Sequence, residues 1–209
     1  MRKLLMRSQP EAWWGSQSDR LAEAWLATGL PTSRLEDWKY TSLAALHAKA
    51  RTVGLGPIDV TAPSGVRVLR LSQLRSDELT TPVLAASVRT LLESNGKIFF
   101  ENFAKSLVAD PFIVLVPDGF SSVTPIEITW RALADGHWGV GVAAVIIGKG
   151  ANVSLVEKYG SNSDAQSISI AVEVQAGARV SHLRLQTGEN RKGSGFVFSA
   201  ARIRVLSDA

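Results

Sequence analysis

The sequence of 209 residues contains no cysteine. This absence excludes disulfide bonds, thiolate metal sites and a cysteine nucleophile, and it leaves the redox compartment undecided. The longest apolar run, Val140 to Ile147, is far shorter than the roughly 20 residues that a membrane-spanning helix needs. The basic start, Met1 to Arg7, is not followed by an apolar segment, so we expect neither a signal peptide nor a membrane anchor. A soluble cytoplasmic protein is the default interpretation.

The charge is modest, with a formal net value of +4. Part of the basic excess lies near the C-terminus and includes Arg179, Arg184 and Arg202. A nucleic-acid interface would need basic clusters interleaved with aromatic residues, and only Phe196 and Phe198 lie among these positions. We therefore expect scattered basic residues on a solvated face and no nucleic-acid partner.

A short glycine-centred pattern recurs four times in the second half of the chain. Its copies are Val116 to Ser122, Ile147 to Val153, Val174 to Val180 and Val205 to Ala209. The equivalent positions are Gly119, Gly150, Gly177 and Asp208, at intervals of 31, 27 and 31 residues. Repeats of about 20–50 residues are typical of solenoids, in which each unit buries its apolar face against its neighbours. Because the units are rich in β-formers, the repeat predicts a β-helix.

Three regions are predicted along the chain, and residues 1–50 form a helical N-terminal region. Ser18 or Asp19 is a plausible N-cap of a first helix, and Gly29 suits the C′ position after it. A second helix is expected over about residues 42–50. The six tryptophans of the chain are expected in the core or at the junction between regions.

Residues 51–110 are predicted as a mixed α/β junction, with a strand at 66–71 and a helix at 82–92. Residues 111–209 form the predicted β-helix. Its strands are expected at 112–116, 125–130, 140–147, 153–159, 167–174, 180–186 and 196–206. The chain ends at the start of a fourth repeat unit, so we expect an incomplete solenoid and a chain that is part of a longer protein.

The second and third repeats also predict how two strands pair. Val156 aligns with Leu183, and Glu157 aligns with Arg184. With the repeats stacked in register, we expect Val156 and Leu183 in the core. Glu157 and Arg184 are then expected in solvent, about one strand spacing, ~4.8 Å, apart. Such an exposed pair contributes at most roughly 0.2–1 kcal/mol, so it reports the register rather than explaining stability.

Residues 29–43, Gly-Leu-Pro-Thr-Ser-Arg-Leu-Glu-Asp-Trp-Lys-Tyr-Thr-Ser-Leu, resemble the N-terminal signature of the SufB/SufD family of iron–sulfur cluster assembly proteins. Three later segments agree in order. They are Phe112 to Pro125 with its Val-Pro-Asp-Gly turn, Ile147 to Tyr159 with Leu-Val-Glu-x-Tyr, and Gly177 to Gln186 with His-x-x-Leu-Gln. The helical segment ahead of the strands resembles SufD more than SufB.

The resemblance implies a mainly β fold, in which a right-handed parallel β-helix follows a small α-helical N-terminal region. It also implies a non-catalytic scaffold subunit of the SUF complex, which pairs with a SufB-like subunit and works with a SufC-like ATPase. The iron–sulfur cluster is assembled in the complex, and no cofactor is expected on this chain alone. The SufC-binding region, the late β-helix positions at the SufB interface and the cluster-related residues of the family lie beyond the matched segments. No site residue is therefore carried over onto this chain.

The three histidines, His47, His137 and His182, do not stand at metal-ligand spacing. His47 is expected on the surface of the second helix, and His137 in a turn before a strand. His182 alternates with Arg184 and Gln186, so its side chain is expected to point outward. We predict no catalytic, cofactor-binding or metal-binding residue in this chain.

Two other groups of residues invite a functional interpretation. The run Glu36 to Tyr40 could be an acid–base cluster, but a helix cap at Glu36 with Trp38 and Tyr40 packed is the better interpretation. Gly148 to Gly150 lacks the ending of a phosphate-binding loop and is expected to be a β-turn.

The alternative function is a carbohydrate-active or carbohydrate-binding β-helix protein. That function needs a row of acidic or aromatic residues along one strand face, which the sequence does not contain. An acyltransferase helix would need a hexapeptide period, which the repeat intervals do not have.

Overall fold

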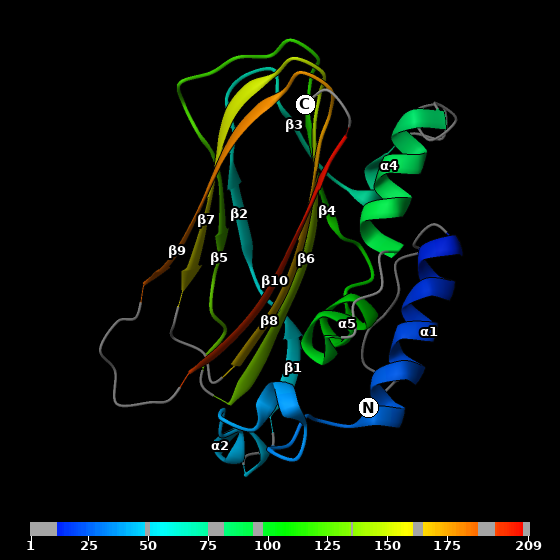
Figure 1. The fold of residues 1–209 in the computed structure, drawn as a ribbon, viewed down its shortest axis with the longest axis vertical. Coiled ribbons are helices and arrows are strands. Elements are labelled where there is room, and N and C mark those ends of the chain that lie inside the picture. The colour runs from blue at the N-terminus through cyan, green and yellow to red at the C-terminus, as the bar shows by residue number, and fades with distance from the viewer. Residues whose placement is uncertain are drawn as a thin grey trace.

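The computed structural model describes residues 12–48, 51–74, 82–93, 98–134, 136–160, 165–187 and 195–206. Its strands form two sheets that lie face to face, and helices cover the outer side of one of them (Figure 1). We call the sheet that carries the helices sheet A and the other one sheet B. Among the described residues, no helix combines the length and the apolar character that crossing a membrane requires.

Most helices and three short strands belong to the first half of the chain. The helical segments are α1 (Ala12–Thr28), η1 (Glu36–Trp38), α2 (Ala44–His47), η2 (Leu71–Gln73), α4 (Pro82–Glu93) and α5 (Phe99–Leu107). The short strands are β1 (Thr52–Leu55), β2 (Ile58–Thr61) and β3 (Arg67–Arg70).

The second half of the chain supplies the other strands. They are β4 (Phe112–Val116), β5 (Ile126–Trp130), β6 (His137–Ile147), β7 (Asn152–Gly160), β8 (Ala165–Val174), β9 (Arg179–Thr187) and β10 (Phe196–Val205). After β4, each strand lies in the sheet other than that of the strand before it. Sheet A has the order β10-β8-β6-β4-β3, with β1 also paired to β6, and sheet B has the order β2-β5-β7-β9.

The predicted mainly β fold, a right-handed parallel β-helix, is wrong. The described residues form a mixed α/β structure with two mixed sheets that are neither closed nor curled. Each sheet contains an antiparallel pair, because β3 runs against β4 and β2 runs against β5. The repeat describes only the strands from β4 onward, whose mutual pairings are parallel. The short strands and the helices lie outside the repeat, so the repeat could not predict how they pair and pack.

The individual elements were predicted unevenly. The strands of the second half and the helix α4 are confirmed. The N-caps proposed at Ser18 and Asp19 are wrong, because α1 begins at Ala12 and both residues lie inside it. The second helix is limited to α2, and α5, β1 and β2 were not predicted from the sequence. Gly29 does follow the end of α1 with φ of 67°, and its N–H donates to the Trp25 carbonyl at 2.9 Å.

The repeat glycines occupy the turns in which they were expected. Gly119, Gly150 and Gly177 have φ of 67°, 63° and 70°, a region that glycine enters without steric cost. Asp208, the fourth repeat position, lies outside the described residues. These turns align the strands that follow them, so β7 and β9 pair in parallel with Val156 opposite Leu183, as the repeat alignment predicted.

Two apolar cores hold the layers together. The core between the sheets contains Ile126, Ile147 and Leu155, and the core between sheet A and the helices contains Trp14 and Phe100. All the tryptophans are buried or partly buried in these cores, as expected. Aromatic rings link α5 to the end of sheet A, because the Phe100 ring stacks on the Phe198 ring of β10 with centroids 3.5 Å apart. The last strand of sheet A is therefore anchored to a helix as well as to β8.

Candidate functional site

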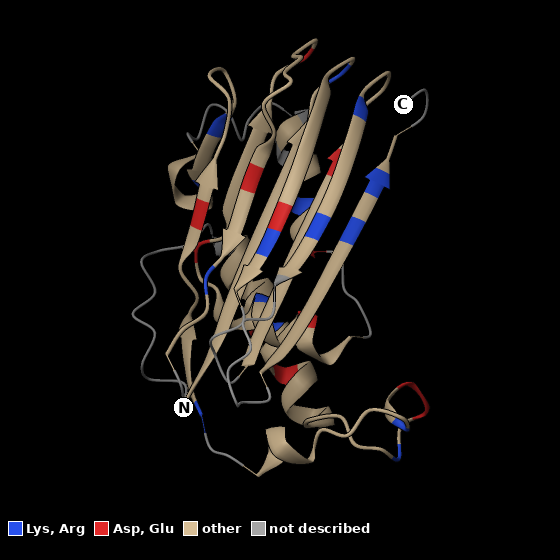
Figure 2. Ribbon diagram, turned by 90° about the vertical axis from the view of Figure 1, so that its left-hand side faces the viewer, with Lys and Arg blue, Asp and Glu red and all other residues tan. Residues whose placement is uncertain are grey.

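Three glutamate carboxylates are fully buried, and an arginine from one of the last two strands binds each of them. We call these six residues the charge layer: Glu157 with Arg184, Glu101 with Arg202, and Glu173 with Arg204. Figure 2 shows basic positions on β9 and β10, with acidic positions on neighbouring elements. Burial of a charge is costly unless it is paired and hydrogen-bonded, so this layer is the most demanding polar arrangement among the described residues.

The Glu157 carboxylate lies between the sheets and accepts hydrogen bonds from four side chains. The His182 Nε2 donates at 2.6 Å, the Trp130 Nε1 at 3.2 Å, and the Tyr159 hydroxyl donates as well. The Arg184 Nε lies 3.2 Å from the same carboxylate, and its Nη2 donates to the Tyr159 hydroxyl at 2.6 Å. The cluster ties β5, β7 and β9 together across sheet B.

The sequence alignment predicted correctly which residues of β7 and β9 pair, but it predicted wrongly which of them are buried. Glu157 does pair with Arg184, and Val156 with Leu183. However, Glu157 is buried and Leu183 is 53% exposed, the reverse of the expected arrangement. His182 was expected to point outward, yet its side chain lies against Glu157 and is only 11% exposed. Alternation along a strand defines two faces but not which one is inside, and the four donors around Glu157 make its burial possible.

The environment keeps the Glu157 carboxylate ionised. Burial opposes ionisation, but hydrogen bonds from His182 and Tyr159 and the charge of Arg184 outweigh it and hold the pKa of Glu157 below its ordinary value. Burial, reinforced by the Glu157 charge, raises the pKa of the Tyr159 phenol, which therefore stays a hydrogen-bond donor. A carboxylate saturated with donors is a poor base, so the cluster is suited to joining strands rather than to proton transfer.

The Glu101 carboxylate anchors β10 to helix α5. Arg202 binds it with two parallel hydrogen bonds, from Nε and Nη2, each 2.7 Å long. The buried Lys105 adds an ion pair at 2.8 Å from the next turn of the helix. Burial opposes ionisation of Glu101, but Arg202 and Lys105 together lower its pKa below the ordinary value. The same burial lowers the pKa of Lys105, and the adjacent Glu101 opposes that shift.

The Glu173 carboxylate connects β8 to α4 and β10. It accepts hydrogen bonds from the Ser87 hydroxyl of α4 and from the Gln175 amide at 2.9 Å, and Arg204 of β10 lies 3.4 Å away. Neither Glu101 nor Glu173 was predicted as a functional residue from the sequence. The available signal was a charged residue within the apolar run Ala171 to Val174, since a glutamate inside a buried strand needs a partner.

Beyond the charge layer, both sheets end in open strand edges. Among the described residues, β9 pairs only with β7, and β10 pairs only with β8. We call this end of the molecule the open end, formed by β9 and β10 with the exposed side chains Leu183, Leu185, Ile203 and Val205. Unpaired strand edges together with exposed apolar side chains are typical of a protein contact surface.

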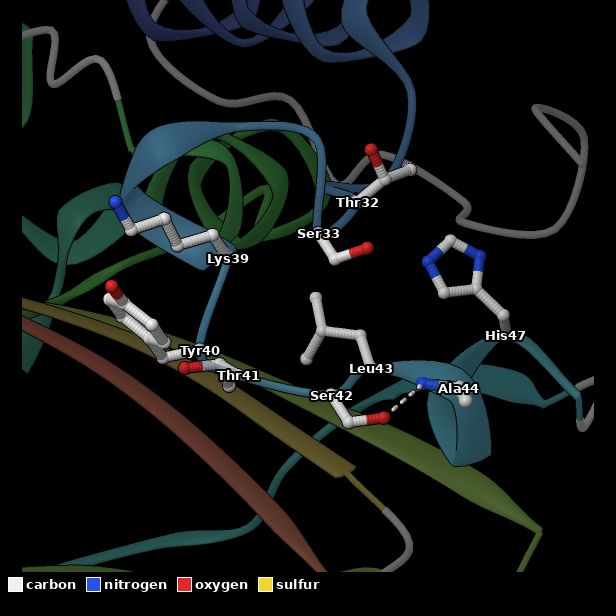
Figure 3. A pocket seen from close by; sticks show the side chains of 9 residues that line it. All are labelled: Thr32, Ser33, Lys39, Tyr40, Thr41, Ser42, Leu43, Ala44 and His47. Carbon is white, nitrogen blue, oxygen red and sulfur yellow. Dashed lines mark hydrogen bonds between the residues drawn. The ribbon is translucent and has the colours of Figure 1, made fainter.

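A pocket of about 450 Å³ lies in the first half of the chain, between the α1–α2 connection and α2. Its lining residues are Thr32, Ser33, Lys39, Tyr40, Thr41, Ser42, Leu43, Ala44 and His47 (Figure 3). The Ser33 hydroxyl points towards the His47 ring, whose Nε2 lies 3.1 Å from the Pro31 carbonyl oxygen. Leu43 is the only buried side chain of the lining, so the pocket is shallow and open to solvent.

Two expectations for this segment are wrong. Glu36 does not cap a helix through its side chain and instead forms an ion pair with Lys39. Tyr40 was expected to pack and is 91% exposed, whereas Trp38 does pack against the helix-side core. The acid–base interpretation gains nothing from this geometry, because the Glu36–Lys39 pair is exposed to solvent.

The remaining predicted positions are dispersed. His47 is exposed on α2, as expected. His137 was expected in a turn and is instead the first residue of β6. Gly148 to Gly150 forms a turn, as expected, in which the Lys149 N–H donates to the Asp118 carboxylate at 2.8 Å. Within the described ranges, no set of three histidine or acidic side chains gathers as a metal site. The absence of catalytic, cofactor and metal residues stays a prediction.

No protein-family model matches the chain, and no curated protein matches it.

Proposed function

We propose that the chain is a non-catalytic scaffold subunit of a SUF-type iron–sulfur cluster assembly complex, similar to the SufD members of the SufB/SufD family. The proposal rests on four sequence segments that resemble the family in the same order along the chain. A SufB-like subunit is the proposed direct partner, and a SufC-like ATPase is a further member of the complex. The cluster is assembled in the complex, in the cytoplasm, and the chain alone binds no cofactor.

One structural observation carries the proposal. The two later segments, Leu-Val-Glu-x-Tyr and His-x-x-Leu-Gln, contribute Glu157, Tyr159 and His182 to one buried cluster. Segments that were matched separately therefore act together in space, next to strand edges that a second subunit could cover. Because Glu157 is saturated with hydrogen-bond donors, the cluster supports a structural role better than a catalytic one.

Co-expression with a SufB-like subunit tests the proposal. The tagged chain is purified by affinity and then by size exclusion, and the tag alone serves as the control. We expect the SufB-like subunit to co-elute with the chain through both steps. Failure to co-elute, with both proteins folded by circular dichroism, contradicts the proposal.

A carbohydrate-active or carbohydrate-binding protein is the alternative from another class. The outer face of sheet B carries Val156, Leu183 and Leu185 beside a Lys158–Glu127 ion pair, rather than a row of acidic or aromatic residues. Polysaccharide depolymerisation by the isolated chain, measured as released reducing ends, would replace the scaffold proposal with this one.

A further inference from the structure

The pocket between the α1–α2 connection and α2 is built by one short stretch of chain. All of its described lining residues lie between Thr32 and His47, and its volume of about 450 Å³ is typical of a small-molecule site. The His47 Nε2 lies 3.1 Å from the Pro31 carbonyl oxygen, and since a carbonyl only accepts hydrogen bonds, this nitrogen carries a proton. The bond joins the start of the stretch to α2, so the walls of the pocket are held together locally.

The lining offers hydrogen-bond donors, and none of its described residues is acidic. The Thr32 hydroxyl oxygen accepts from the Arg34 N–H at 3.4 Å, and the Ser42 hydroxyl oxygen accepts from the Ala44 N–H at 3.5 Å. Because each oxygen already accepts a hydrogen bond, its own O–H group is left to donate. Donors without a competing carboxylate suit a ligand rich in acceptor atoms, such as a phosphate group.

One cation lines the pocket and is held only by an exposed partner. The Lys39 ammonium group forms an ion pair with Glu36, whose side chain is 80% exposed and does not line the pocket. Ion pairs with this much exposure are weak, so an anion in the pocket can replace Glu36 as the partner of Lys39. Glu36 is therefore a competitor of an anionic ligand.

An aromatic ring lies beside this cation. Tyr40 also lines the pocket, and its side chain is 91% exposed. The Lys39 Nζ lies 4.9 Å from the centroid of the Tyr40 ring. An exposed aromatic face is a surface on which a planar ring can stack. The pocket thus combines a cation and a stacking surface on adjacent residues.

We propose that this pocket binds a small molecule that joins a phosphate group to a planar ring, which is the chemistry of a nucleoside monophosphate. The phosphate would take the place of Glu36 on Lys39, and the ring would stack on Tyr40. The His47 Nε2 already donates to the Pro31 carbonyl and is not a base, so the site binds its ligand without converting it. The proposal does not depend on the scaffold function, since it needs no partner subunit.

Three probes test the proposal on the full chain, namely adenosine monophosphate, inorganic phosphate and adenosine. Binding is followed by the amide chemical shifts of the isotope-labelled protein. We expect adenosine monophosphate to shift the signals of residues 32–47 and to bind about tenfold or more tightly than either of the other probes. No saturable shift in this stretch, or equal affinities for adenosine monophosphate and inorganic phosphate, overturns the proposal.

Two substitutions should change the affinity for adenosine monophosphate in opposite directions. Lys39→Gln removes the cation and should weaken binding by about tenfold, whereas Glu36→Gln removes the competitor and should strengthen binding by about threefold. Lys158→Gln is the matched control, because Lys158 is as exposed as Lys39 and is likewise paired with a glutamate, Glu127. The control should change the affinity by less than about twofold.

Tyr40→Ala separates the contribution of the ring from that of the phosphate. We expect it to weaken binding of adenosine monophosphate by about fivefold and to change the affinity for inorganic phosphate by less than about twofold. Circular dichroism checks that each variant is folded. Equal effects of Lys39→Gln and Lys158→Gln, or weaker binding by Glu36→Gln, would mean that phosphate is attracted without a specific site and would overturn the proposal. None of these outcomes alters the co-elution expected with a SufB-like subunit.

Discussion

Strands β8 and β10 pair residue for residue, yet they occupy different environments. Every residue of β8 is buried, whereas β10 is only partly buried and becomes exposed towards its end. Strands β7 and β9 differ in a similar way, since the inward Leu155 and Glu157 of β7 are buried while Arg184 of β9 is partly exposed. Register alone therefore does not decide burial. Within each of these two pairs, the strand with a strand neighbour on both sides is the more buried one.

The contrast also shows how the edge strands are attached. Inner strands are held on both sides by strand pairing and by apolar packing. The edge strands have one strand neighbour each among the described residues, and their arginines reach back to glutamates buried in the preceding elements. The charge layer thus joins the open end to the apolar interior.

Breaking the Glu101 ion pairs should have the largest effect. Glu101→Ala leaves the buried Lys105 without its carboxylate and removes the bidentate partner of Arg202. We expect a loss of about 3–5 kcal/mol in the free energy of unfolding, measured by urea denaturation. The comparison variant is Glu36→Ala, which breaks the exposed pair with Lys39 and should cost about 1 kcal/mol or less. Equal costs would mean that the charge layer contributes no more than a surface ion pair.

Replacing one isoleucine with alanine on the inner strand β8, and one on the edge strand β10, sharpens the comparison between these two strands. Ile170→Ala on β8 removes a fully buried side chain and should cost about 2–5 kcal/mol in unfolding free energy. Ile203→Ala on β10 removes a side chain that is more than half exposed and should cost about 0.5 kcal/mol or less. Thermal and urea unfolding of both variants measure the difference. A cost at Ile203 that matches the cost at Ile170 would show that the open end is covered in the isolated chain.

Two glycines of β6 test how tightly the inner strands pack. A Cβ at Gly141 would lie 2.6 Å from the Trp130 ring, whereas the nearest atom to a Cβ at Gly139 is 3.7 Å away. Gly141→Ala should therefore destabilise the protein by about 1–3 kcal/mol. Gly139→Ala should change the unfolding free energy by about 0.5 kcal/mol or less. A tolerated Gly141→Ala would place the Trp130 ring elsewhere.

Acid titration tests whether the buried Glu157 carboxylate is ionised, and it has the smallest expected effect of these tests. The pKa of Glu157 is below its ordinary value when the protein is folded, so its stabilising contribution is present above the unfolded pKa of about 4.3. That contribution is lost as the pH falls through the lower folded pKa. The difference in unfolding free energy between wild type and Glu157→Gln should shrink as the pH falls from about 6 to about 3. Glu36→Gln is the control and should show little difference at either pH. A difference for Glu157→Gln that does not change with pH would contradict the assigned ionisation.

Much of the second half of the fold could be predicted from sequence, because alternating residues and glycine turns mark each strand. The burial of the Glu157 and His182 side chains could not be predicted, since it depends on hydrogen-bond donors from β5 and β9 that only the folded sheet brings together. Helix α5 was missed although Phe100, Phe103 and Ala104 recur at helical spacing, because the short apolar run Ile98 to Phe100 does not by itself distinguish a helix from a strand. The antiparallel partners β2 and β3 lie outside the repeat, so its period carried no information about them.

Amide hydrogen exchange of the chain, alone and with a SufB-like subunit, tests the central claim most directly. Complex formation should slow exchange on β9 and β10 while leaving exchange on β6 and β8 nearly unchanged, since those strands are already paired on both sides. Exchange that stays unchanged along the described chain in the presence of a folded SufB-like subunit would contradict the proposed scaffold function.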